Sequence, residues 1–185
     1  MALARGHLYR GALSRSGVTF SLVTVDVSRA DEPVETQALP VDGYLADLSA
    51  DGDLLGLVRY DRPSPSEDNP GRTWLALYDL TAPGNPTRLS DTVLGTRPGY
   101  AYDLPLIAVS GSQVYVAAPV GTPRAGGTPE ISLYVVDATD PAAPWVVSSR
   151  PLHGATALLA TPGYLFVAGS CTSDGVTCGV LVLDM

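Results

Sequence analysis

Short apolar runs alternate with clusters of glycine and proline along the whole chain. Residues 21–27, 113–120 and 131–136 are rich in β-branched or aromatic residues, placed either at every second position or in short continuous runs. Such patterns are typical of β-strands with one or two buried faces. No segment keeps the spacing of apolar residues that a helix needs over about ten positions. The pattern therefore predicts an all-β protein built from many short strands.

One motif occurs three times with fixed internal spacing. In each copy an Asp is followed by Ser or Thr two residues later and by Pro seven residues later. The copies are Asp26, Ser28 and Pro33; Asp79, Thr81 and Pro86; and Asp137, Thr139 and Pro144. A fourth copy begins at Val180 and reaches Asp184. Successive Asp residues of the motif are 47 to 58 residues apart, which leaves room for four strands in each period.

We interpret these nine repeat residues as turn residues. An Asp at a strand end can accept hydrogen bonds from backbone N–H groups of the following turn, and Ser or Thr can form similar bonds. Pro fixes φ and removes a backbone donor where an outer edge strand begins. A catalytic or metal-binding role for the Asp residues is the alternative, and we disfavour it because recurrence in every repeat is what an architecture requires.

The repeat predicts how the strands are organised in space. A four-stranded meander cannot bury both faces of its own sheet, so neighbouring sheets must stack. We predict a β-propeller of about four antiparallel blades, at approximately residues 1–41, 42–94, 95–152 and 153–185. The first blade has at most the tail of its first strand and the last lacks its fourth, so two blades are complete and two incomplete.

The incomplete blades predict that the chain is a fragment of a larger ring. Alternatively, its two ends meet, or two chains complete one ring. Open blade edges also predict self-association, because exposed strand edges tend to pair. A two-sheet sandwich is the alternative fold.

Three segments resemble the LVIVD-repeat family of β-propellers. They are residues 107–111, residues 114–117 and the sequence LYVVDATDPAAP at residues 133–144. The resemblance extends over nearly the whole chain and is closest at residues 99–150, whereas the second copy departs from it through a long inserted loop and the sequence LTAPGNP. It implies blades of this size, a bacterial or archaeal protein of the cell surface or exterior, and no catalytic motif common to the family.

Composition and charge exclude several classes of protein. The chain has 185 residues, of which 45% are hydrophobic and 16% charged, as expected for one globular domain and not for a disordered chain. Its net charge is −8, and all eleven of its basic residues are Arg. This balance argues against nucleic acid as a partner. No apolar run approaches the ~18 residues of a membrane span.

The two cysteines, Cys171 and Cys178, flank a short segment that contains an Asp-Gly turn. Antiparallel strands joined by such a turn could bring the two sulfur atoms within bonding distance, so we predict a disulfide. The alternatives are two reduced thiols or half of a metal site, for which only His7 and His153 could serve as further His ligands. A disulfide suits an oxidising compartment, and together with the resemblance it predicts an extracellular or cell-surface location.

The sequence contains none of the common catalytic, nucleotide-binding or metal-binding motifs. We therefore predict a non-enzymatic protein with no catalytic residues, no cofactor and no metal. The leading hypothesis is a scaffold that binds a protein or saccharide ligand. The alternatives are a propeller domain of an enzyme, with its active site over the central channel, and a purely structural segment of a large surface protein.

We expect a ligand at the end of the propeller where the loops vary most in length. The candidate binding residues are Arg97, Tyr100 and Tyr102 in the segment 95–103, with Trp74 and Arg124 at the edges of neighbouring loops. Tyr, Trp and Arg are the residue types that dominate the energetics of many interfaces. For Tyr102, packing against the core between two blades is an equal alternative.

Overall fold

The computed structural model describes residues 1–13, 19–61, 71–97, 105–120, 130–152, 155–171 and 178–184, with the backbone alone at positions 97, 170, 171 and 178. These residues form fifteen strands and no helix. The prediction of an all-β protein is therefore confirmed. No helix in this part of the chain is long and apolar enough to cross a membrane.

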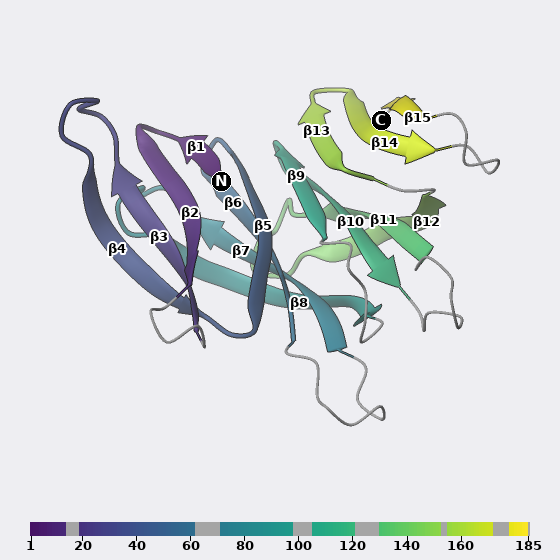
Figure 1. Ribbon diagram of the computed structural model, residues 1–185, viewed down its shortest axis with the longest axis horizontal. Coiled ribbons are helices and arrows are strands. Elements are labelled where there is room, and N and C mark those ends of the chain that lie inside the picture. Colours follow the sequence, from purple (N-terminus) through teal and green to yellow (C-terminus); the bar gives the residue numbers. More distant parts are fainter. Residues whose placement is uncertain are drawn as a thin grey trace.

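The strands form four antiparallel sheets, and in each sheet the strands follow chain order (Figure 1). Sheet A contains β1 (Ala2–Ala4), β2 (His7–Leu13), β3 (Phe20–Asp26) and β4 (Val34–Val41). Sheet B contains β5 (Tyr44–Asp51), β6 (Leu54–Tyr60), β7 (Gly71–Asp79) and β8 (Thr87–Arg97). Sheet C contains β9 (Leu106–Ser110), β10 (Gln113–Val120), β11 (Glu130–Asp137) and β12 (Trp145–Leu152). Sheet D contains β13 (Ala157–Thr161), β14 (Tyr164–Cys171) and β15 (Cys178–Asp184).

The predicted period of four strands is present in sheets A, B and C. Sheet A has a first strand of only three residues, β1, where the sequence indicated at most the tail of a strand. Sheet D has three strands among the described residues. The described residues form no closed ring.

Glycine makes the tight turns between the first two strands of sheets B and C possible. Gly52 has φ of +59° and Gly111 has φ of +57°, a region that residues with a Cβ rarely adopt. Each of these glycines is the first of the two residues that separate the first strand of its sheet from the second, so the hairpin closes within two residues.

Three hydrophobic cores hold the four sheets together, one between each pair of successive sheets. The first joins sheets A and B around Tyr9 and Leu55, and the second joins sheets B and C around Leu75 and Val116. The third joins sheets C and D around Leu133. Sheets B and C therefore bury both faces, which explains why their central strands are apolar at nearly every position.

The first strands of successive sheets lie against one another: β1 packs on β5, β5 on β9 and β9 on β13. At the junction of sheets B and C, three side chains on one face of β5 accept hydrogen bonds from alternate N–H groups of sheet C, two in β9 and one in the residue that follows it. The pairs are Asp47 Oδ2 with Ile107 N at 3.1 Å, Ser49 Oγ with Val109 N at 3.1 Å, and Asp51 Oδ2 with Gly111 N at 2.7 Å. Because alternate residues of a strand share a face, the sequence Asp-x-Ser-x-Asp matches alternate N–H groups of the neighbouring strand.

The meander divides the connections between two opposite ends of the sheets. The turns after the first strand of each sheet, and after the third strand of sheets A, B and C, lie at one end, which we name the turn end. The second strand of each sheet, and the fourth strand of sheets A, B and C, finish at the opposite end, which we name the loop end. All of the repeat Asp residues stand at the turn end, where the third strands finish.

Candidate functional site

The three repeat Asp residues at the turn end form the same local structure. Their carboxylates accept hydrogen bonds from the N–H of the residue two positions later: Ser28 to Asp26 at 2.8 Å, Thr81 to Asp79 at 2.9 Å, and Thr139 to Asp137 at 2.8 Å. Hydroxyl and backbone hydrogen bonds from these same residues lower the pKa of each Asp. Pro33, Pro86 and Pro144 stand directly before β4, β8 and β12. This geometry is that of an Asx turn leading into the outer strand of a sheet.

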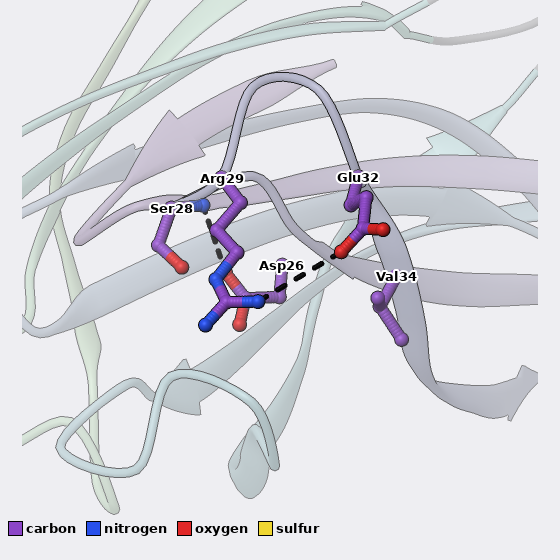
Figure 2. Close-up of a pocket in the computed structure, with 5 residues that line it drawn as sticks. All are labelled: Asp26, Ser28, Arg29, Glu32 and Val34. Carbon is purple, nitrogen blue, oxygen red and sulfur yellow. Dashed lines mark hydrogen bonds and ion pairs between the residues drawn. The ribbon is translucent and has the colours of Figure 1, made fainter.

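The first of these turns encloses a shallow pocket of about 370 Å³, lined by Asp26, Ser28, Arg29, Glu32 and Val34 (Figure 2). Figure 2 shows the Arg29 and Glu32 side chains meeting across its mouth, with 3.8 Å between Arg29 Nη1 and Glu32 Oε2. Both side chains are more than 70% exposed, so the pair adds little stability and does not fix the pocket in shape. We therefore interpret this pocket as a surface feature of the turn.

A larger hollow of about 740 Å³ lies at the turn end between sheets C and D. We name it the turn-end groove. Its walls are residues 110–113, residues 161–163 and Asp51, and its floor is formed by Tyr115 and Val135. The Tyr115 side chain is almost fully buried, and burial raises the pKa of its hydroxyl. The walls of the groove thus combine the neutral hydrogen-bonding side chains of Ser112, Gln113 and Thr161 with the carboxylate of Asp51, above a floor that is mostly apolar.

Hydrogen bonds fix the walls of the turn-end groove. The Gly111 N–H donates to Asp51 at 2.7 Å and so links the wall to sheet B. The Ser112 carbonyl accepts from the N–H of Ala138 at 2.7 Å, which ties the same turn to the end of β11. A site whose polar groups are already positioned loses less entropy when a ligand binds.

A buried charged cluster occupies sheet B near the loop end. The Arg59 side chain is only 7% exposed, and its Nη2 lies 2.6 Å from Asp91 Oδ2. Arg59 Nη1 donates to the carbonyl of Asp42 at 3.0 Å, and the guanidinium carbon lies 4.7 Å from the centre of the Trp74 ring. The Trp74 indole N–H donates to Asp61 Oδ1 at 2.8 Å. These contacts hold the indole ring in one orientation at the base of the loop end.

Two of the predicted binding residues lie elsewhere than expected. Trp74, expected at the edge of a loop, is inside β7 and half-buried, because its indole N–H and its ring are both engaged in the cluster around Arg59. Arg97, expected in the connection 95–103, is the last residue of β8 and pairs in register with Gly71. Tyr100, Tyr102 and Arg124 lie outside the described residues, so a binding role for them stays a prediction.

Sequence reasoning missed the acidic partners of the buried cluster, Asp61 and Asp91, and the turn-end groove. A signal for the cluster does exist: Arg59 is the one charged residue in the apolar run of β6 (LLGLVRY). A charge in such a run needs a partner. The partner could not be identified from the sequence, because Asp91 is 32 residues away on another strand.

The backbones of Cys171 and Cys178 are directly opposite each other in the antiparallel pair of β14 and β15. The pairing across the intervening segment is the one that the sequence indicated. The disulfide itself stays a prediction. Within the described ranges, no three His, Cys, Asp or Glu side chains are grouped so that they could hold a metal ion.

The comparisons with family models and with curated proteins found no relative of this chain. No family model matches the chain, and no curated protein matches it significantly. The resemblance to LVIVD-repeat propellers therefore stays a prediction that depends on the repeat residues alone.

Proposed function

We propose that the four sheets are successive blades of a β-propeller, part of a larger ring, and that the chain is a non-enzymatic interaction module. The order of packing supports the architecture, because each sheet meets the next through its first strand and the two middle sheets bury both faces. Blades around a common axis share this arrangement. The two sheets of a sandwich, in contrast, each bury one face against the other.

We propose an extracellular or cell-surface location for this module. The support is the cross-strand position of Cys171 and Cys178, which is compatible with a disulfide. Disulfides persist in oxidising compartments and are rare in the reducing cytosol.

We assign ligand binding to the turn-end groove, and its shape and lining carry the functional proposal. Its volume of about 740 Å³ falls within the range of roughly 300–1,000 Å³ found for ligand sites. Ser112, Gln113 and Thr161 can exchange hydrogen bonds with the amide groups of an extended peptide, while Tyr115 and Val135 provide an apolar floor for its side chains. The proposed ligand is therefore an extended segment of a partner protein.

Selection from a displayed library of random peptides tests this function. We expect the purified chain to enrich a family of related peptides, whose dissociation constants are then measured by isothermal titration calorimetry. Ser112→Arg places a large side chain at the groove and is expected to weaken binding at least tenfold. Ser148→Arg, on the exposed outer strand β12, is the matched control and is expected to leave binding unchanged.

Two results would show the assignment to be wrong. The first is binding that survives Ser112→Arg but is lost when Arg97, Tyr100 and Tyr102 are all replaced by Ala, which would place the ligand at the loop end. The second is a library that yields no binding peptide while a glycan array yields a bound saccharide. Failure of both libraries would favour the purely structural role.

A further inference from the structure

The outward face of sheet D is apolar, and none of the described residues covers it. In the register of this sheet, Leu159 pairs with Phe166, and Phe166 pairs with Val182, so the three side chains form one row across the face. Leu159 and Val182 are 61% and 51% exposed. The neighbouring row of Ala157, Ala168 and Val180 lies on the same face, and Val180 is 62% exposed. Exposed apolar surface of this kind marks an interaction site more often than chance.

The repeat shows what this face does in the other sheets. Ser110 pairs with Gln113 at the turn of sheet C as Thr161 pairs with Tyr164 in sheet D, so the two sheets can be aligned residue by residue. By this alignment the row of Leu159, Phe166 and Val182 corresponds to the row of Ala108, Tyr115 and Val135. That row packs against sheet D in the third core. The uncovered face of sheet D is therefore in the position that contacts the following sheet.

Sheet A has the complementary face, which is likewise not covered by any residue in the described ranges. Its row of Leu3, Leu8 and Val25 corresponds, by the same alignment, to the row of Ala50, Leu55 and Tyr78 in sheet B. The sheet B row packs against sheet A in the first core. The Leu3 side chain is 66% exposed, and the pair of Arg10 and Glu35, with 3.5 Å between Arg10 Nη2 and Glu35 Oε2, lies beside this row. Sheet A thus presents the face that would receive a preceding sheet.

We propose that these two faces bind each other between two copies of the chain, and that the copies close into one ring of eight sheets. The proposal rests on the propeller architecture proposed above. At every sheet junction within the chain, the earlier sheet contributes the face on which Tyr115 lies in sheet C, and the later sheet contributes the face on which Leu55 lies in sheet B. Two equivalent faces never meet at these junctions. Joining sheet D of one copy to sheet A of the other continues this order. A second such junction closes the assembly with two-fold symmetry, and eight is within the usual number of blades.

The oligomeric state of the full chain tests the proposal. Light scattering coupled to size-exclusion chromatography should give the mass of a dimer. The double variant Leu159→Lys/Val182→Lys and the single variant Leu3→Lys should both weaken dimerisation at least tenfold, because each buries a charge in the junction. All three positions are largely exposed in the single chain, so the variants are expected to fold. Val147→Lys, at an exposed position of β12 outside the junction, is the matched control and should remain dimeric.

Mixing the two monomeric variants tests whether each junction joins sheet D of one copy to sheet A of the other. A mixed dimer keeps one junction free of substitutions, formed by sheet D of the Leu3→Lys copy and sheet A of the other, so dimers should reappear on mixing. Three results would overturn the proposal: a monomeric wild-type chain at its highest soluble concentration, a Leu3→Lys variant that still dimerises, or a mass that grows without limit as concentration rises. The peptide-binding assay on the monomeric variants tests the proposed function independently.

Discussion

The buried charged cluster around Arg59 makes a quantitative test of the structure possible. Arg59→Met keeps an unbranched apolar side chain but removes the guanidinium that lies over the Trp74 ring and donates to Asp91 and to the Asp42 carbonyl. The Asp91 side chain is 14% exposed. Of its two Arg partners it would then keep Arg88, whose side chain is half exposed and whose Nη2 lies 3.1 Å from Asp91 Oδ2. Removing one partner of a buried ion pair costs roughly 3–5 kcal/mol. Because Arg88 remains, we expect a loss of about 3 kcal/mol in the free energy of unfolding.

Urea denaturation followed by circular dichroism measures this loss. For a chain of this length, a destabilisation of about 3 kcal/mol corresponds to a decrease in Tm of roughly 6–12 °C. Arg29→Met provides the matched control, because Arg29 and Glu32 form an exposed pair at 3.8 Å. The loss of this pair should change the free energy of unfolding by less than about 0.5 kcal/mol.

The double variant Arg59→Met/Asp91→Leu tests whether the cost arises from an unpaired charge. Leu has the same branching as Asp, with two methyl groups in place of the two carboxylate oxygen atoms, so the double variant removes both charges and keeps a branched side chain at position 91. We expect it to recover at least about 2 kcal/mol relative to Arg59→Met alone, because apolar replacements of buried ion pairs are often neutral. A double variant less stable than the single one would refute the reasoning. So would an Arg59→Met variant as stable as the wild type.

Three further predictions follow from single features of the structure. Gly56→Ala would place a Cβ 2.7 Å from Ile107 Cδ1 in the second core. We expect it to lower the free energy of unfolding, measured by thermal denaturation, by about 1–3 kcal/mol. Gly179→Ala, whose Cβ would meet nothing within 4 Å, is the control and should leave stability unchanged. The pKa values of the repeat Asp carboxylates are lowered from 3.8. These carboxylates therefore stabilise the fold above pH 3.8, and this stabilisation is lost as the pH falls through their pKa values in the folded protein. In an acid titration, Asp79→Asn should lose less unfolding free energy than the wild type does. The two cysteines should resist alkylation without reductant, leaving the mass measured by mass spectrometry unchanged.

Strands in this chain could be located from the sequence because their burial pattern is local. The expected strand at 113–120 coincides with β10, and those at 21–27 and 131–136 differ by one residue at each end from β3 and β11. The repeat likewise identified the four periods. The first strand of sheet A was harder to identify, because β1 has only three residues and is recognised as a strand by its antiparallel pairing with β2.

The candidate sites were less predictable because they depend on residues far apart in the chain. Arg59 and Asp91 are 32 residues apart, and no local pattern links them. Trp74 was expected at the edge of a loop, but it lies inside β7 and is half-buried, with its indole N–H donating to Asp61. The turn-end groove combines turns of sheets C and D with Asp51 of sheet B, a combination that only the stacking of the sheets creates.

The three hydrogen bonds from β9 and the residue after it to side chains of β5 have a mechanical consequence. Sliding sheet C by one residue along sheet B would bring carbonyl groups opposite the carboxylates of Asp47 and Asp51, and electrostatic repulsion would oppose the shift. A contact formed by apolar side chains alone would not oppose such a shift to the same extent. We therefore expect sheets B and C to open as one unit, so that their amide protons exchange with deuterated solvent together.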